Sequence, residues 1–456
     1  MRFGSLADAP ASFVLVGARV VDPLAGDEGT RDVAVLDGRL AAPEQASADV
    51  PRIDVGGLVA APAFCDLHTH LRQPGGEAAE TIASGTRAAA HGGYATVCAM
   101  PNTEPPLDEP ARVAWVQSCA ADASARVRVV AAATVGRAGD LLAPYGALAG
   151  IGVVGVSDDG SALASARMAR SAMAYLAPLG VPLVEHAEDA DLAGASLMRS
   201  GPTATRLGLA GWPASAELTV VERDIALAAE TGARLHLTHL STAAALDAVR
   251  RAKARGLPVT CDVTPHHLAL TDKWVAGDRR FAWEDPAEDP APLDPELAYD
   301  GSCRVNPPLP SRADALALLA GVADGTIDAI ATDHAPHPPE RKAVEFERSA
   351  PGMIGLETAL SIGLAAVAAE TLPLPRLLQA LGAGPAALIG EERSLRVGEL
   401  ADLVVFDPVA RWRVDAKALA SASANTPLLG MELPGVMRLT VASGRVTYVS
   451  DLAPLA

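Results

Sequence analysis

His68 and His70 are separated by one residue and belong to the segment 66–72, which follows the apolar run of residues 58–65. Successive side chains of a β-strand point to opposite faces, so both imidazoles would point the same way if this stretch is a strand. Arg72 would join the same row if the strand continued that far. Two converging imidazoles are a candidate pair of metal ligands, and a guanidinium beside them would supply a fixed positive charge. The pair alone is a weak signal, so the other histidines and acids decide the matter.

Further histidines and acids follow the short β-type runs of the chain. These runs are residues 94–100, 126–131, 152–156, 182–186, 234–239, 259–263 and 329–333. The polar residues at or just beyond their ends are Asn102, Asp158, Asp159, His186, His239, His266 and Asp333. Each has an ordinary alternative, since a lone histidine at a strand end is usually only hydrogen-bonded, and an Asp-Asp-Gly run also fits a turn with a helix cap. The recurrence of such residues at strand after strand favours a metal site.

The chemistry of this set is that of a hydrolytic metal centre. Imidazole and carboxylate ligands without a thiolate suit zinc and its chemical neighbours. A site with fewer protein ligands than coordination positions leaves room for a water molecule, whose pKa falls towards about 7 on the metal. The residues therefore predict metal-assisted hydrolysis with Zn2+ as the cofactor, and they leave open whether one or two ions bind per subunit.

Eight β-type runs, counting the one before His68, alternate with Ala/Leu-rich helical stretches. This pattern predicts an α/β fold, a (β/α)8 TIM-like barrel whose C-terminal rim carries the chemistry. Residues 11–60 and the last sixty residues read as short strands separated by turns, and we expect them to pair into one small β-sandwich domain. The predicted boundaries are residues 1–60 and 391–456 for the two parts of the sandwich and 61–390 for the barrel.

Composition excludes several classes of partner. The chain has 456 residues, half of them hydrophobic, and a formal net charge of -18, which opposes binding to nucleic acid or to an anionic membrane. Neither a leader sequence nor a run of about 18 apolar residues is evident, so no membrane association is expected. The five cysteines are widely spaced and odd in number, which is typical of reduced thiols in a cytoplasmic protein.

The motifs, taken together, resemble those of the bacterial class I dihydroorotases of the cyclic amidohydrolase superfamily. They occur in the family's order and, with the flanking sheet domain, cover nearly the whole chain. They are residues 66–72, 98–103, 157–160, 185–186, 239–242, 264–268, 306–309, 331–337 and 425–427.

The resemblance implies a set of metal ligands. His68, His70 and Asp333 would bind one metal ion, His186 and His239 a second, and Asp159 would bridge the two. Hydantoinases, allantoinases and the other dihydroorotase class place a carbamylated lysine at the bridging position, and residues 152–159 contain no lysine. Asp159 is assigned because its offset from His186 matches the family, with Asp158 as the alternative.

The resemblance also implies a reaction, the reversible cyclisation of N-carbamoyl-L-aspartate to L-dihydroorotate and water in pyrimidine biosynthesis. In the hydrolytic direction a metal-activated hydroxide attacks the ring amide, and Asp333 acts as general acid and base. The substrate carboxylate requires a fork of donors from Arg72, with Asn102 and His337 beside it. Asn306 and the backbone at Pro351 and Gly352 would hold the ring.

Two other functions and one segment stay open. A hydantoinase-like cyclic amidohydrolase is disfavoured by the missing lysine and by the Arg72 and Asn102 pair. A catalytically weak dihydroorotase-like scaffold subunit for aspartate transcarbamoylase is disfavoured by the complete ligand set, although an active enzyme could assemble with the same partner. We expect a small-molecule substrate and a homo-oligomer. Residues 271–300, rich in proline and acids, predict either an ordered excursion or lid near the substrate entrance, or a solvated insertion without function.

Overall fold

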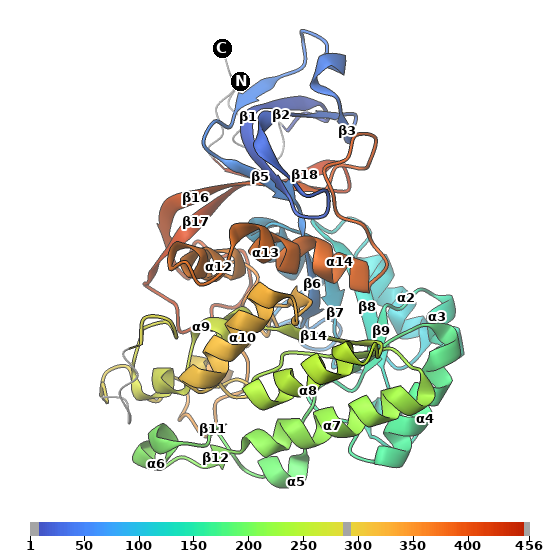
Figure 1. Ribbon diagram of the computed structural model, residues 1–456, viewed down its shortest axis with the longest axis vertical. Helices are drawn as coiled ribbons and strands as arrows, with labels where there is room; N and C mark the ends of the chain where they lie inside the picture. The colour runs from blue at the N-terminus through green and yellow to red at the C-terminus, as the bar shows by residue number, and fades with distance from the viewer. Residues whose placement is uncertain (1–8, 286–292, 451–456) are drawn as a thin grey trace.

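The computed structural model describes residues 9–285 and 293–450. A barrel with its surrounding helices forms the larger part, and a curved sheet that carries both ends of the described chain lies against it (Figure 1). This is the architecture that the sequence predicts. The predicted domain boundaries stay a prediction.

The barrel consists of eight parallel strands in sequence order. They are β6 (Phe64–Thr69), β7 (Tyr94–Ala99), β8 (Arg126–Ala132), β9 (Gly155–Ser157), β10 (Leu183–Glu185), β13 (Leu235–Leu237), β14 (Val259–Val263) and β15 (Ala329–Ile330). Closure occurs just beyond β15, where His334 forms a parallel bridge with Thr69 and its carbonyl accepts from the His70 N–H at 2.9 Å. The predicted (β/α)8 barrel is therefore confirmed.

Several strands end earlier than their apolar runs predict, because the backbone turns away from the pleat at the polar residues. His239 and Asp333 have φ values of 39° and 47°, in the left-handed region that ends an extended strand. Arg72 likewise has a φ of 58°, so strand geometry does not continue from His70 to Arg72. Most of the residues that the sequence singles out thus lie in the loops that follow the strands, whereas His68 lies within β6.

Helices connect consecutive strands and cover the outside of the barrel. The main ones are α1 (Ile82–Gly92), α2 (Pro110–Cys119), α3 (Tyr145–Gly150), α4 (Ala166–Leu176), α7 (Ala214–Thr231), α8 (Ala243–Ala254), α10 (Arg312–Asp324), α12 (Ala359–Ala368), α13 (Leu374–Leu378) and α14 (Gly384–Leu388). The apolar faces of these helices, except that of α14, share one hydrophobic cluster with the outward faces of the strands, and Ala386 of α14 belongs to a separate cluster. Across the described ranges, none of the helices has the length and apolar character that a membrane crossing requires.

Both chain ends contribute to the second sheet. Its order is β18-β17-β16-β5-β1-β2-β3, with β4 paired to β1. The strands are β1 (Phe13–Asp22), β2 (Asp27–Leu36), β3 (Arg39–Ala41), β4 (Arg52–Asp54), β5 (Val59–Pro62), β16 (Leu403–Arg413), β17 (Glu432–Ala442) and β18 (Arg445–Val449). Antiparallel pairing of β5 with β16 joins the two ends, and the sheet curls around one apolar core. The predicted discontinuous domain is confirmed.

The described part of the segment 271–300 is an ordered excursion. The short helix η5 (Asp272–Ala276) and the turn after it bury Trp274 and Phe281 in a hydrophobic cluster separate from that of the barrel helices. Packing of this kind excludes the solvated alternative for these residues. Residues 286–292 lie outside the described part, so a role as a lid stays a prediction.

Candidate metal centre at the C-terminal rim of the barrel

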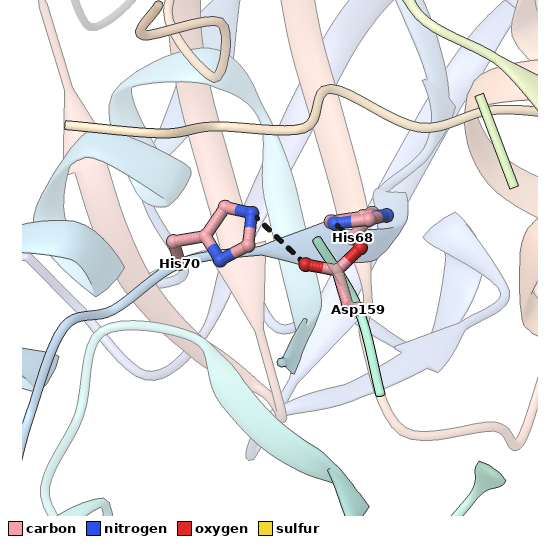
Figure 2. Close-up of side chains that lie close together, drawn as sticks. All are labelled: His68, His70 and Asp159. Carbon is pink, nitrogen blue, oxygen red and sulfur yellow. Dashed lines mark ion pairs between the residues drawn. The ribbon is translucent and has the colours of Figure 1, made fainter. Parts of the chain in front are cut away.

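The predicted ligands His68, His70 and Asp159 meet in a buried group. Their ligand atoms lie within 4.8 Å of one another. Figure 2 shows the Asp159 carboxylate between the two imidazoles: Nε2 of His68 is 3.3 Å from Oδ1 and Nε2 of His70 is 3.6 Å from Oδ2. The alternation that the sequence predicts for the two histidines therefore holds.

A second group shares Asp159 with the first. Nδ1 of His186 and Nε2 of His239 are 3.0 Å apart, and each is 3.9 Å from Oδ1 of Asp159. The Asp159 carboxylate thus lies between two pairs of histidines, which is the geometry that a bridging ligand needs.

Asp158, the alternative to Asp159, is turned away from the histidines. Its Oδ1 accepts from the backbone N–H groups of Ala133 and Thr134, both at 3.0 Å, and its Oδ2 accepts from the Thr134 hydroxyl. These bonds join the loops after β8 and β9. The structure therefore gives Asp158 a supporting contact and gives Asp159 the position among the histidines.

Asp333 follows β15, the strand next to β6 where the barrel closes, and its carboxylate lies beside the first group. Its Oδ1 lies 2.9 Å from Nε2 of His70 and 3.5 Å from Nε2 of His68. The carboxylate also lines the cavity at this rim, so it faces both the histidines and a bound molecule.

The imidazoles are oriented by contacts at their other nitrogen. Nδ1 of His68 is 2.8 Å from the Thr238 hydroxyl, and Nδ1 of His70 is 2.8 Å from Oδ1 of Asn102. Such outer contacts fix the ring and leave the remaining nitrogen for a metal. Asn102 also donates from Nδ2 to Oδ2 of Asp159 at 3.1 Å.

The electrostatics of the group favour a cation. Burial opposes ionisation of Asp159 and Asp333 and is the largest single influence on each, but the surrounding imidazoles, led by that of His68, together keep the pKa of both carboxyls below their usual range. Burial alone would lower the pKa of His68, yet the two carboxylates raise it to about 10. Burial, with repulsion from His239 second, lowers the pKa of His186 to about 3, so this ring is neutral at pH 7. The anions therefore attract positive charge, which a proton or a metal ion can supply.

The donor set fits a divalent metal. Within the described ranges, Nε2 of His68 is buried without a hydrogen-bond partner although two carboxylates lie near it. An unpaired buried nitrogen is costly unless something else, such as a metal, uses its lone pair. Nitrogen and oxygen donors suit zinc and its neighbours.

A cavity of about 210 Å³ opens above this group. The sequence-predicted substrate residues Arg72, Asn102, Asn306, His337, Pro351 and Gly352 all line it. The structure does not bring His266 into this lining; its ring packs against that of His267, with centroids 4.6 Å apart.

Arg72 enters the cavity by a turn rather than by strand alternation. Its Nε donates to the Pro336 carbonyl at 3.2 Å, and its Nη2 is 3.4 Å from Nε2 of His337. In the described part of the chain no carboxylate forms an ion pair with Arg72. Glu77 and Glu80, which could have paired with it, contact the Gly75 amide and other groups instead.

Sequence reasoning missed the residues that support the site. Glu80 is buried and pairs with His334, whose Nε2 is 3.3 Å from Oε2 of Glu80, so a distant acid holds the loop next to Asp333. The Arg137 guanidinium donates to the carbonyl of Asp158 at 3.1 Å and also to that of Asp159. In the sequence, Glu80 is marked only as an acidic residue shortly before a helical stretch. Acidic residues in that position are too common to indicate a functional role.

Comparison with known proteins shows that the chain is similar to dihydroorotases. A family model described as dihydro-orotase-like matches residues 57–245, and one described as the amidohydrolase family matches residues 365–448. A dihydroorotase from Anaeromyxobacter dehalogenans strain 2CP-C is 45% identical over 438 residues, which are 95% of this chain and 96% of that protein. A dihydroorotase from Geobacter sp. strain M21 is 41% identical over 446 residues, 96% of this chain and 99% of that protein.

Solved structures with the same fold include L-hydantoinase (dihydropyrimidinase) from Arthrobacter aurescens, with a TM-score of 0.81 at 23% identity and coverage of 97% of both chains. At that identity the likeness concerns the fold. The full-length similarity to the dihydroorotases is the stronger finding, and it agrees with the motifs and with the buried histidine and aspartate groups. The chain belongs to the dihydroorotase family of the amidohydrolases.

Proposed function

We propose that the protein is an active, zinc-dependent dihydroorotase that interconverts N-carbamoyl-L-aspartate and L-dihydroorotate in pyrimidine biosynthesis. The observation that carries the proposal is the position of the Arg72 guanidinium in the same cavity as two adjoining histidine and aspartate groups. A ring with a carboxylate substituent needs both features. The dihydroorotases with 40–45% identity support the same activity.

The proposed ligands are His68, His70 and Asp333 for one metal position and His186 and His239 for the other, with Asp159 between them. A divalent metal bound there would polarise the ring carbonyl and acidify water. Zinc is proposed on the nitrogen and oxygen donors alone, and the geometry admits one or two ions.

Asp333 is proposed as the general acid and base. Its lowered pKa leaves it ionised at neutral pH, the state that accepts a proton. From the rim it would take a proton from the attacking water and give it to the departing ring nitrogen. Arg72 and His337 would hold the substrate carboxylate, while Asn306 and the backbone at Pro351 and Gly352 would hold the ring.

Asn102 is proposed to bind substrate indirectly as well as directly. It lines the cavity, but both ends of its amide already contact proposed ligands. Its Oδ1 contacts the imidazole of His70, and its Nδ2 donates to the carboxylate of Asp159. Its main effect would therefore be to fix those two groups, with the substrate carboxylate approaching from the Arg72 side.

The test is metal analysis of the purified protein together with a dihydroorotate hydrolysis assay. We expect bound zinc, loss of turnover after chelation and recovery when zinc is added back. A metal-free preparation with full turnover would refute the metal-dependent mechanism. Full metal content without turnover would favour the scaffold role.

The wider setting of the protein is part of the proposal. The described cysteines are all free thiols, which supports a cytoplasmic location. A homo-oligomer, and assembly with aspartate transcarbamoylase, rest on the resemblance to the family. Light scattering of the protein alone and mixed with aspartate transcarbamoylase measures both.

A further inference from the structure

Lys342 is a buried lysine whose ammonium group contacts backbone carbonyls. It ends the short helix α11 (Pro339–Lys342) and is 8% exposed. Its Nζ donates to the carbonyls of Ala350 at 2.7 Å and Gly352 at 2.9 Å, with that of Arg304 at 3.4 Å. Within the described ranges no carboxylate lies within ion-pair distance of Nζ. Because burying a charge without a counter-charge is costly, the position of this lysine calls for a function.

The three carbonyls belong to two loops that face the same cavity. One loop runs from Arg304 to Asn306, and the other contains Pro351 and Gly352; Asn306, Pro351 and Gly352 all line the cavity above the candidate metal centre. The Gly352 N–H also donates to the Arg304 carbonyl at 2.8 Å. The Lys342 ammonium group and the Gly352 N–H therefore both donate to the Arg304 carbonyl, and these two bonds connect the loops.

The second loop packs closely against its surroundings at Gly352. Gly352 has a φ of +128°, and a Cβ built on it would lie 2.7 Å from the Ala335 Cβ and 3.1 Å from Nε2 of His337. Nε2 of His337 is also 2.8 Å from the Pro351 carbonyl. A shift of this loop would therefore displace the imidazole beside Arg72 as well.

We propose that Lys342 is a positioning residue that sets the width of the substrate cavity by clamping the Asn306 loop to the Pro351–Gly352 loop. The inference rests on the proposed function, because it assumes that the cyclic substrate lies between these loops. Lys342 itself touches no reacting atom. Its loss would weaken substrate binding without altering the candidate metal centre.

The clamp responds to pH near neutrality. Burial lowers the pKa of Lys342 to about 7, with attraction by Asp300 opposing burial and repulsion by Arg304 adding to it. The Cys303 thiol also lies near the lysine, but burial raises its pKa far above neutrality, so it carries no charge at pH 7. His337 also faces the lysine, but burial lowers its pKa to about 3, so it is neutral at pH 7. An ammonium group has three donors and a neutral amine has two. One of the three carbonyls therefore loses its bond to Nζ as the pH rises through about 7.

Kinetics of Lys342→Met test the proposal, with Lys417→Met, which removes an exposed lysine, as the matched control. Hydrogen bonds from a charged donor to the loops are lost, so KM for dihydroorotate should rise by roughly ten- to a hundred-fold with little change in kcat. Metal content should equal that of the wild type. The wild-type KM should rise between about pH 6 and pH 8, and this rise should be absent in the variant. An unchanged KM and pH profile in a folded variant would overturn the clamp.

Amide hydrogen exchange separates this inference from the proposed function. Exchange of the Gly352 amide, measured on the full chain without substrate, should accelerate in Lys342→Met. The hydrogen bond from this amide to the Arg304 carbonyl would then be the one that remains there, without the bond from the ammonium group beside it. Failure of the wild type to hydrolyse dihydroorotate would refute the proposed function while the exchange result still decides on the clamp. Should Lys342→Met not fold, Lys342→Gln keeps a donor without the charge. A wild-type rise of KM between about pH 6 and pH 8 in that variant would overturn the clamp, because an amide does not titrate in this range.

Discussion

Two cavities of the same volume, about 210 Å³, lie at opposite ends of one barrel. The second one opens at the N-terminal ends of β10, β13 and β14 and is lined mainly by aliphatic side chains. The same strands serve both cavities: β6 gives Leu67 to the N-terminal cavity and leads into His70 at the rim, and β10 contributes Val184 before it leads into His186. Position along a strand, rather than the volume of the cavity, therefore decides where the barrel can do chemistry.

The histidines of the two ends differ in the same way. Both ring nitrogens of His236, in the N-terminal cavity, have partners: Nδ1 is 2.9 Å from the Thr260 hydroxyl and Nε2 is 2.8 Å from Oδ2 of Asp262. In the described part of the chain, Nε2 of His68 at the rim has no hydrogen-bond partner, although the carboxylates of Asp159 and Asp333 lie 3.3 and 3.5 Å away. A histidine with both nitrogens satisfied stabilises the barrel, and one with a nitrogen left over is available to a ligand.

The largest effect is expected from Asp159→Ala, which should lose metal and reduce turnover to background, because the carboxylate between the two histidine pairs is removed. Its neighbour provides the control. Asp158→Ala should keep its metal and lose stability, since each unpaired buried donor costs about 1–3 kcal/mol. Metal analysis and denaturant unfolding of both variants measure this. Equal metal loss in the two would undo the assignment of the rim group.

Asp333→Asn should lower kcat by roughly a hundred- to ten-thousand-fold, the usual worth of a general acid and base, because an amide cannot accept the proton. The fold should be intact, as judged by circular dichroism and unfolding. Turnover close to that of the wild type would show that another group moves the proton.

Arg72→Met should lower kcat/KM for dihydroorotate by roughly thirty-fold to several thousand-fold, because truncating one partner of a desolvated charge pair costs about 2–5 kcal/mol. Metal content should not change, since the contacts of Arg72 are with Pro336 and His337. If the variant instead loses metal or unfolds, the arginine is structural and the carboxylate must be held by other groups.

The smallest kinetic effect is expected at the other end of the barrel. Val184→Ala should destabilise the fold by about 1–2 kcal/mol through lost apolar burial, while kcat/KM stays within about two-fold. His186→Ala, two residues further along the chain, should lose metal and activity. A large kinetic effect of Val184→Ala would show that the N-terminal cavity takes part in function and would break the comparison.

Sequence reasoning reached the strands and the polar residues at their ends because both follow local rules, whereas the assignment of metal ligands among those residues came from the family resemblance. Apolar runs predict strands, and alternation correctly places His68 and His70 on one side. It failed where the backbone leaves the strand: Arg72 reaches the cavity through a left-handed turn, which alternation does not describe.

The supporting contacts could not be predicted because they join distant parts of the chain. His68 depends on Thr238, 170 residues away, and His334 depends on Glu80, 254 residues away. Nothing local distinguishes these residues from other buried polar groups. Lys342 was missed for the same reason, since its partners are backbone carbonyls that only the folded loops bring together.

The most direct test of the central claim compares two substrates on the same purified, zinc-loaded enzyme: L-dihydroorotate and dihydrouracil, the same ring without the carboxylate. If the guanidinium of Arg72 selects a carboxylate beside the candidate metal centre, the wild type should strongly prefer dihydroorotate, and Arg72→Met should lose most of that preference. Comparable hydrolysis of both rings by the wild type would contradict the account and favour a hydantoinase-type activity.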